Sequence, residues 1–390
     1  MTDTPSGQRK RLLLVTTSVG AGHNSVARAI HQELTAAGSL DVTLLDSMEI
    51  VPKWFRKAYA DGFMLGMSRF PGIYGLLYVL TNRPQTPALG LAERLRLRIE
   101  RRAVRAIPPL LASQHFDLIV HTHYLVPPVI GWMRRCGMPT APQFVMVTDI
   151  ETHRLWHCPD VDHWFLPTVY TAQAFRRWGV SEDQMTVSGI ALQPKWSAPL
   201  DRARIYADWD LPSDRPIVLL SGGTEFVCGP VTRLAHGICR ACPRAVVVVL
   251  AGRNKKLLEE LAARPEPQGR VRAVAFTDRG HELAEVSAMM VTKPGGVTTA
   301  ECLAKGTPMV LTDPVPGHEG GNAQYLACNE AAAIVRGEAD ALATIARLLD
   351  RPELLRRMSE NARRLHRPGR EIIAAAILRA LGLGGAGRGA

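Results

Sequence analysis

The stretch Val291–Tyr325, VTKPGGVTTAECLAKGTPMVLTDPVPGHEGGNAQY, decides the fold of this chain. It runs from a strand end through a Gly-Gly turn into a helix, and then through a second apolar strand into a loop rich in proline and glycine. The amino end of a helix that follows such a turn binds anions, because its N–H groups and its dipole point at the ligand. The stretch therefore predicts a parallel α/β domain with a phosphate site at this turn.

The polar residues of this stretch suit a sugar nucleotide. Gly295 and Gly296 lack a Cβ, so the backbone can come close to a phosphate. We expect Thr298 and Thr299 to open the helix and Glu301 to lie in its first turn, where a carboxylate can accept from two ribose hydroxyls. Further donors and acceptors suited to sugar hydroxyls follow at His318, Glu319, Asn322 and Gln324.

Strands and helices alternate on both sides of this stretch. The second half begins near Pro216 with IVLLSGGTE and continues through AVVVVLAG and VRAVAF, with helical patterns between the strands. The first half has apolar strands at 11–16, Asp41–Leu45, Leu118–His121 and Phe144–Thr148. This repeated pattern predicts an α/β protein with two Rossmann-like domains facing a central cleft.

The length of 390 residues exceeds the usual size of one hydrophobic core, so two domains are expected. We place the domains at 1–195 and 196–370, followed by a helix end and a glycine-rich tail at 371–390. The stretch Gln193–Pro216 contains four prolines and is expected to link the two halves.

The net charge of +11 suits an anionic partner. No nucleic-acid-binding motif accompanies it, so a membrane surface is favoured over nucleic acid. The seven scattered cysteines favour a reducing cytoplasm. The amino terminus does not have the apolar run of a signal peptide, and no segment has the length of a membrane span.

The segment from Val51 to Arg105 departs from the strand–helix alternation. It mixes basic residues with large apolar ones, beginning at Trp54, Phe55, Arg56 and Lys57, and it ends in an arginine-rich helix. This mixture fits an interfacial segment whose aromatic side chains insert at headgroup depth. The alternative is a helical insertion that packs on the domain with a solvated charged face.

Two stretches resemble a known family: GAGHNSVARAI at Gly20–Ile30 and TKPGGVTTAECLAKGTPMVLTDPVPGHEGGNAQYL at Thr292–Leu326. They are similar to the monogalactosyldiacylglycerol synthase and processive diacylglycerol glucosyltransferase branch of glycosyltransferase family 28. Weaker matches lie at Val147–Pro167 and Ser221–Gly229, so the resemblance spans about residues 10 to 380.

The resemblance implies the GT-B fold and an inverting hexosyltransferase. Such an enzyme moves galactose or glucose from UDP-galactose or UDP-glucose to diacylglycerol, giving a β-monoglycosyldiacylglycerol. It implies that 1–195 binds the acceptor and the membrane and that 196–370 binds the donor. No metal or other cofactor is expected. The protein would lie in the cytoplasm, peripherally on the inner face of the cell membrane and its anionic surface.

Carried over residue by residue, the resemblance implies a donor site formed by Gly222, Gly223, Thr224, Gly295, Gly296, Thr298, Glu301, His318, Glu319 and Asn322. The first six face the diphosphate, Glu301 binds the ribose, and Glu319 and Asn322 contact the sugar. His318 stands where the branch usually has glutamine, so the choice between glucose and galactose stays open.

Direct attack by the acceptor hydroxyl requires a base. His23 lies at the strand-to-helix turn of the first domain, and a neutral imidazole is a suitable base near pH 7. Asp149 follows the strand Phe144–Thr148 and could serve as the base or orient a catalytic histidine. The alternative to a catalytic role is a structural one: His23 would be a residue at the start of a helix, and Asp149 would be an N-cap.

The acceptor side is expected to include His123, Tyr124, His153 and Trp156, the last two against the lipid headgroup. His121 and His123 have a spacing that also suits metal ligands, but no set of cysteines or glutamates accompanies them. We therefore expect no metal site.

Other functions compete with this one. The segment Gly20–Ser25 approximates a dinucleotide-binding GxGxxG with Asp46 downstream, but a serine replaces the third glycine and His23 would occupy the pyrophosphate position. Within the same fold, the alternatives are an N-acetylglucosaminyltransferase acting on a polyprenyl-linked peptidoglycan precursor and a UDP-sugar epimerase. A non-catalytic sugar-nucleotide-binding protein is the alternative from another class.

Overall fold

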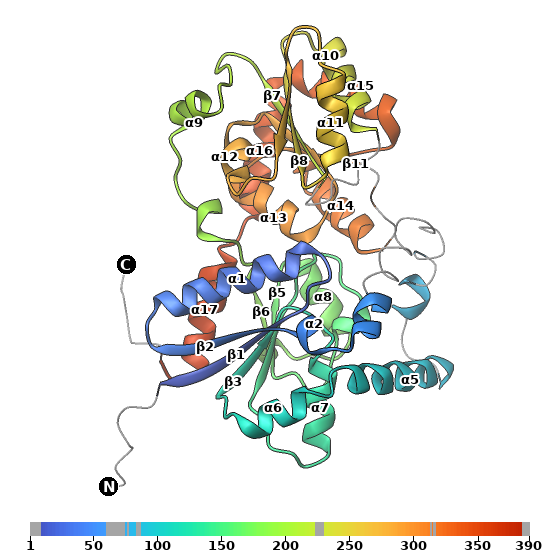
Figure 1. The fold of residues 1–390 in the computed structure, drawn as a ribbon, viewed down its shortest axis with the longest axis vertical. Helices are drawn as coiled ribbons and strands as arrows, with labels where there is room; N and C mark the ends of the chain where they lie inside the picture. Colours follow the sequence, from blue (N-terminus) through green and yellow to red (C-terminus); the bar gives the residue numbers. More distant parts are fainter. Residues whose placement is uncertain are drawn as a thin grey trace. The chain divides into compact units, whose positions relative to one another are not determined.

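The chain forms two compact units in the computed structural model (Figure 1). Unit 1 comprises Met1–Gln193 and Pro368–Ala390, and unit 2 comprises Pro194–Arg367. The residues that the structure describes are 9–59, 75, 78–82, 87–222, 230–312, 314 and 317–383.

The core of unit 1 is a six-stranded parallel sheet in the order β2-β1-β3-β4-β5-β6. Its strands are apolar and mostly buried, as expected for a parallel sheet with helices on both faces. The strands are β1 (Lys10–Thr16), β2 (Leu40–Asp46), β3 (Leu118–His121), β4 (Gln143–Met146), β5 (His163–Leu166) and β6 (Met185–Val187).

Helices cover both faces of this sheet, with α1 and α17 on one side and α6 and α7 on the other (Figure 1). The helices of unit 1 are α1 (Ala21–Ala36), α2 (Ser47–Ile50), α5 (Pro87–Ala103), α6 (Ile107–Ser113), α7 (Pro127–Arg135), α8 (Val169–Arg177) and α17 (Gly369–Ala380), with 3-10 turns η1 (Arg154–Trp156) and η2 (Glu182–Gln184). Residues 53–59 and 78–81 are also helical.

The last helix, α17, returns to unit 1 after the chain has completed unit 2. Its Arg370 forms an ion pair with Glu33 of α1 at 2.9 Å. Its first residue, Gly369, lies so close to Ile190 that a Cβ there would be 2.7 Å from the backbone carbonyl carbon. Glycine is therefore required at this contact.

Unit 2 is built around a second six-stranded parallel sheet, in the order β12-β11-β10-β7-β8-β9. Its strands are β7 (Ile217–Ser221), β8 (Val246–Gly252), β9 (Val271–Ala275), β10 (Met289–Thr292), β11 (Met309–Thr312) and β12 (Ala332–Val335). Its helices are α9 (Arg202–Asp208), α10 (Val231–Ala241), α11 (Lys255–Ala263), α12 (Gly280–Val286), α13 (Gly296–Lys305), α14 (His318–Cys328), α15 (Gly337–Leu349) and α16 (Pro352–Leu365), with the 3-10 turn η3 (Pro194–Trp196).

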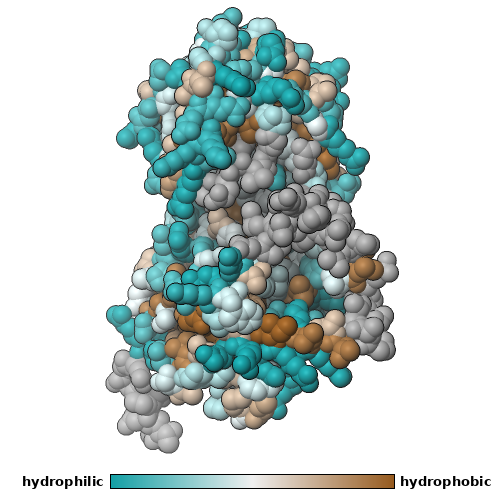
Figure 2. Space-filling view, turned by 45° about the vertical axis from the view of Figure 1, so that its right-hand side comes forward, coloured by the Kyte–Doolittle hydropathy of each residue, from teal (hydrophilic) through white to brown (hydrophobic). Residues whose placement is uncertain are grey.

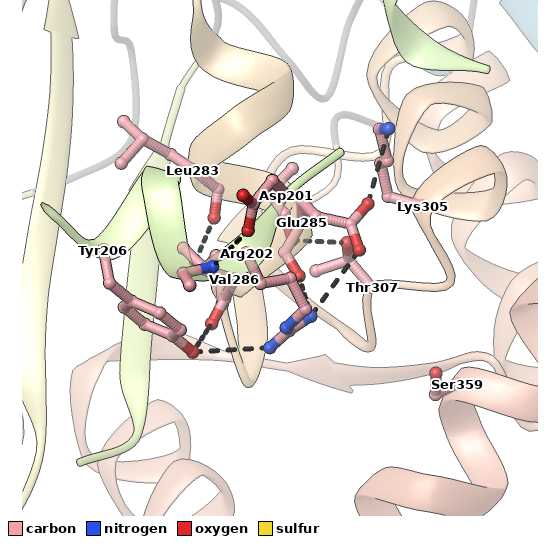
Figure 3. Close-up of polar contacts among 12 residues, drawn as sticks. Asp201, Arg202, Tyr206, Leu283, Glu285, Val286, Lys305, Thr307 and Ser359 are labelled. Carbon is pink, nitrogen blue, oxygen red and sulfur yellow. Dashed lines mark hydrogen bonds and ion pairs between the residues drawn. The ribbon is translucent and has the colours of Figure 1, made fainter. Parts of the chain in front are cut away.

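The proline-containing stretch Gln193–Pro216, which was expected to link the two halves, begins at the boundary between the units and packs on unit 2. Arg202 of α9 donates to the backbone carbonyl of Glu285, and the Tyr206 hydroxyl donates to the carbonyl of Val286 at 3.5 Å (Figure 3). Lys305, at the end of α13, donates to the carbonyl of Ala198 at 3.1 Å. Polar contacts thus tie this stretch to α12 and α13, and only its first residue belongs to unit 1.

Among the residues that the structure describes, no helix is long and apolar enough to cross a membrane.

Candidate functional site

The turn between β1 and α1 is held by a polar network. Gly20 precedes the helix with φ of 84°, in the left-handed region that favours glycine. The Asp46 carboxylate accepts from the backbone N–H of Ser18 at 3.1 Å, and the Asn24 amide donates to the Ser18 hydroxyl at 3.0 Å. These bonds set the start of α1 and thereby the position of His23 in its first turn.

The ring of His23 is oriented by the neighbouring strand. Its Nδ1 lies 2.7 Å from the backbone oxygen of Thr122, and the Thr148 hydroxyl lies 3.3 Å from the same nitrogen. A carbonyl oxygen can only accept, so Nδ1 of a neutral ring carries the proton. Nε2 is then the basic nitrogen, which is the arrangement that a general base needs.

The structure brings His23 together with three other residues predicted for the site. The His123 ring meets the His23 ring edge-on, with centroids 4.7 Å apart, and stacks on Tyr124 at 4.1 Å. Tyr124 in turn meets Trp156 edge-on at 5.4 Å. We call His23, His123, Tyr124 and Trp156 the ring cluster. Burial lowers the pKa of His123 well below its usual value, and the nearby His23 lowers it further, so His123 stays neutral near pH 7.

Asp149 lies in the loop that follows β4 and is half-buried. Burial is the main cause of the raised pKa of Tyr124, and the charge of Asp149 contributes to it. The second candidate base is therefore also close enough to the ring cluster to affect it electrostatically.

His153 contacts a different part of unit 1. Its Nδ1 accepts from the backbone N–H of Leu155 at 3.0 Å, and its Nε2 lies 2.9 Å from the Thr81 hydroxyl. The Tyr78 ring meets it edge-on at 4.7 Å. These bonds connect residues 78–82 to the loop that carries Asp149 and Trp156, and contact of His153 with a lipid headgroup stays a prediction.

Two residues next to the ring cluster were not singled out by the sequence. The Tyr59 ring lies 6.3 Å from the His123 ring, centroid to centroid, and burial together with the neighbouring Tyr124 raises the pKa of the Tyr59 hydroxyl. Glu100 of α5 acts electrostatically on both tyrosines. Tyr59 follows the buried Phe55 by one helical turn, and this spacing was the signal that it faces inward.

The predicted membrane-contacting group Trp54, Phe55, Arg56 and Lys57 is divided between two faces of a helix. Trp54 is 56% exposed, and Arg56 and Lys57 are exposed as well. Phe55 is only 5% exposed and packs in the core of unit 1 with Met48. The prediction that Phe55 inserts into lipid was therefore wrong, because the helix turns this ring toward the sheet.

The outer face of α5 carries an apolar stripe. Leu91, Leu95 and Ile99 recur every fourth residue and are 70%, 57% and 43% exposed. Figure 2 shows a hydrophobic row over this part of unit 1, bordered by hydrophilic side chains. The exposed arginines on the same side of the helix are Arg94, Arg98 and Arg102.

In unit 2, the Gly-Gly turn after β10 starts α13. Gly295 is the N-cap, and no side chain caps the helix. A Cβ placed on Gly295 would meet no atom of the described residues within 4 Å, so they leave the space beside this turn open. Gly222 directly follows β7, whereas Gly223 and Thr224 lie outside the described residues.

Glu301 lies in the second turn of α13 and not in the first, because the helix already begins at Gly296. The Thr299 hydroxyl, expected at the helix start, instead donates back to the carbonyl of Gly296 at 2.9 Å. Burial raises the pKa of Glu301 to about 8, although Lys195 lowers it. A carboxyl that keeps its proton near pH 7 can both donate to and accept from ribose hydroxyls.

Helix α14 supports the Gly-Gly turn from behind. Asn322 is fully buried, and its amide donates to the carbonyl of Pro294 at 2.9 Å. This bond gives Asn322 a bracing role in the chain, whereas contact with the sugar stays a prediction. Glu319 is buried and His318 half-buried in the first turn of the same helix.

A further pair at the carboxyl edge of this sheet was missed. Arg253 follows β8, and its guanidinium lies 4.8 Å from the ring centroid of Phe276, which follows β9 and is 58% exposed. Ligands of parallel sheets bind outside this edge. The position of Arg253 and Phe276 directly after their strands could therefore have identified them in the sequence.

Known proteins match this chain over most of its length. The family model described as monogalactosyldiacylglycerol (MGDG) synthase matches residues 23–192. The processive diacylglycerol beta-glucosyltransferase of Bacillus subtilis (strain 168) is 26% identical over 363 residues, covering 92% of this chain and 91% of that protein. Its counterpart from Bacillus licheniformis is 27% identical over 365 residues, with the same shares covered.

Solved structures share the fold at low identity. The S. aureus MnaA–UDP co-structure has a TM-score of 0.63 and 12% identity, covering 96% of this chain and 97% of that one. MurG of Acinetobacter baumannii has a TM-score of 0.58 and 15% identity, covering 95% and 100%. These likenesses and the two parallel sheets confirm the predicted α/β fold of the GT-B type.

Proposed function

Because the chain belongs to the monogalactosyldiacylglycerol synthase and processive diacylglycerol glucosyltransferase branch of glycosyltransferase family 28, we propose that it transfers galactose or glucose from a UDP-sugar to the 3-hydroxyl of diacylglycerol. The product would be a β-linked membrane glycolipid. The observation that carries this proposal within the site is the orientation of His23, whose Nδ1 faces a carbonyl oxygen.

Unit 2 would hold the UDP-sugar. The N-terminus of α13 offers backbone N–H groups and the positive end of the helix dipole to the diphosphate. Glu301, protonated near neutral pH, would bind the ribose hydroxyls. These groups would also stabilise the charge that develops on the diphosphate as it leaves.

Unit 1 would activate the acceptor. His23 Nε2 takes the proton of the diacylglycerol hydroxyl while its oxygen forms a bond to the anomeric carbon. The bond from that carbon to the UDP oxygen breaks on the opposite face, and the electron pair leaves with UDP. Attack from the opposite face inverts the configuration and gives the β product. Asp149, which is electrostatically coupled to Tyr124, is the alternative base.

The acceptor is a membrane lipid, so unit 1 would act at a bilayer surface. The apolar stripe of α5 can insert between headgroups while Arg94, Arg98 and Arg102 meet anionic lipid. Trp54, Arg56 and Lys57 provide a second exposed group of the same composition. We place the protein peripherally on the inner face of the cell membrane.

The test is incubation of the protein with vesicles that contain diacylglycerol and an anionic lipid, in the presence of UDP-glucose or UDP-galactose. The expected product is a glycosyldiacylglycerol, identified by mass, with the β anomer identified by NMR. UDP-N-acetylglucosamine with the same vesicles is the donor control. Absence of a glycosylated diacylglycerol with both hexose donors would overturn the proposal.

A further inference from the structure

The side chain of Thr16, at the end of β1, lies between the helix that carries His23 and the loop that carries Thr122. It is buried, and its hydroxyl donates to the Asn24 amide oxygen at 2.8 Å and accepts from the Thr122 hydroxyl at 3.1 Å. Asn24 directly follows His23 in α1, and Thr122 supplies the carbonyl oxygen that lies 2.7 Å from His23 Nδ1. One hydroxyl therefore joins both sides of the hydrogen bond that orients the candidate base.

The direction of these hydrogen bonds is fixed from the far end of the network, at Asp46. The Asp46 carboxylate only accepts, so the Ser18 hydroxyl donates its single proton to it. The Ser18 oxygen then accepts from the Asn24 amide nitrogen at 3.0 Å, which turns the amide oxygen of Asn24 toward Thr16. Because Thr16 donates its one proton to this oxygen, it must accept from Thr122. The donors thus follow one direction, from Thr122 to Asp46.

A network with a single direction holds its members in one geometry, since each hydroxyl satisfies both neighbours in only one arrangement. No described side chain caps the N-terminus of α1, so the bond from Thr16 to Asn24 fastens the first turn of this helix. On the other side, the backbone N–H of Thr122 donates to the Val15 carbonyl at 3.0 Å. The bond between the Thr122 and Thr16 hydroxyls is a second attachment, and it fixes the direction of the Thr122 carbonyl.

We propose that Thr16 is a positioning residue that keeps the Thr122 carbonyl aligned with Nδ1 of His23. This alignment confines the proton of the neutral ring to Nδ1 and leaves Nε2 as the basic nitrogen. Without the Thr16 hydroxyl, the Asn24 amide oxygen and the Thr122 hydroxyl each lose a buried partner, and the ring and the carbonyl move out of alignment. The inference rests on the proposed function, because it assumes that His23 is the base.

The neighbouring Thr17 offers a matched control. Thr17 is also buried, and its hydroxyl lies 2.8 Å from that of Ser47, so this bond leads to α2 and not to α1. The test compares Thr16→Val and Thr16→Ser with Thr17→Val. For each variant we would measure kcat and KM for the UDP-sugar. The ring 15N shifts of His23 would be measured without substrate, by two-bond 1H–15N correlation NMR.

The expected result for Thr16→Val is a fall in kcat of about tenfold or more with KM unchanged, because a misoriented base lowers turnover and not donor binding. The wild-type ring shifts should show the proton on Nδ1, and in Thr16→Val the two shifts should move toward each other as the second tautomer is populated. Thr16→Ser keeps the hydroxyl and should retain kcat and the ring shifts. Thr17→Val should lower Tm and leave kcat and the ring shifts unchanged.

Two results would overturn the inference: normal kcat with unmoved ring shifts in folded Thr16→Val, or the same loss of kcat in Thr17→Val. If Thr16→Val does not fold, Thr122→Val decides, because it keeps the backbone carbonyl and removes only the hydroxyl that bonds to Thr16. Failure of the proposed function is distinguishable. The wild-type protein would then form no glycolipid, whereas the ring shifts need no substrate and would still test the position of His23.

Discussion

The first turn of α1 in unit 1 and the first turn of α13 in unit 2 are built from the same parts. Each follows a parallel strand and a glycine, and neither helix has a capping side chain or an acid in its first turn. The third residue is His23 in α1 and Thr298 in α13. The turn of unit 1 therefore presents an imidazole ring, and the turn of unit 2 presents a threonine hydroxyl and two glycines.

The difference lies in what surrounds each turn. In unit 1, the neighbouring strand brings the Thr122 carbonyl against His23, and aromatic rings pack around it. In unit 2, Asn322 braces the turn from behind, and the described residues leave the space beside Gly295 open. The same local structure thus suits proton transfer where a carbonyl and rings orient a histidine, and anion binding where the turn itself is formed by two glycines.

The largest expected effect is the loss of turnover when His23, in the unit 1 turn, is replaced. His23→Ala should lower kcat by about 10²–10⁴-fold, the usual contribution of a general base, and leave UDP affinity unchanged. His31→Ala, in the same helix, is the control and should keep wild-type turnover. A larger loss in Asp149→Asn than in His23→Ala would move the role of base to Asp149.

Binding to an anionic membrane surface should depend on arginines of unit 1 and not on those of unit 2. Replacing Arg94, Arg98 and Arg102 with glutamine should weaken binding to anionic vesicles by about 100-fold, since each arginine near such a surface contributes about 1 kcal/mol. The matched control removes the same charge from exposed positions of unit 2, with Arg351, Arg356 and Arg367 changed to glutamine. Equal losses in a flotation assay would show that net charge and not α5 governs binding.

At the unit 2 turn, Glu301→Ala should weaken UDP binding by about 10- to 100-fold, because hydrogen bonds to the ribose are lost from a partly buried site. Isothermal titration with UDP measures this change. Glu353→Ala, at an exposed position of α16, is the control. Unchanged affinity in Glu301→Ala would remove the ribose assignment.

Asn322→Ala separates bracing of the turn from contact with the sugar. Loss of the bond to Pro294 should lower stability by about 1–2 kcal/mol and weaken UDP and UDP-sugar binding alike, by a few-fold. If Asn322 instead contacts the sugar, UDP-sugar affinity should fall while UDP affinity is retained. Parallel titrations with the two ligands decide between these roles.

A change at Glu301 should also alter the pH dependence of stability. The pKa of Glu301 is raised from 4.5 to about 8 by burial, so the folded chain binds more protons than the unfolded chain between these values. Stability contributed by this residue therefore falls as pH rises through this range. Glu301→Gln should gain Tm relative to wild type as pH increases from 5 to 8, and a constant difference would contradict the raised pKa.

Much of the fold followed from local sequence patterns. The apolar run Leu118–His121 has the bounds of β3, and the run Asp41–Leu45 lies within β2, because strand periodicity is a local property. The prolines of Gln193–Pro216 indicated a linker, but they did not indicate that Arg202 and Lys305 hold the stretch in unit 2 by contacts between distant segments. Such long-range contacts have no local signature.

The candidate site was predictable in part. His23, His123, Tyr124 and Trp156 were chosen from motifs, and the structure brings them together. The sequence could not show that Tyr59 lies beside them, since this residue comes from an insertion with no clear strand pattern.

By itself, the sequence determined two alternating strand–helix halves, the glycine turns after their strands and the family they resemble, because these depend on neighbours along the chain. Only the tertiary structure decided that Phe55 faces the core while Trp54 faces outward, that α17 returns to unit 1, and that α5 buries Glu100 in an ion pair with Arg96. The physical reason is that helix phase and contacts between distant segments are set by packing, which no single segment specifies.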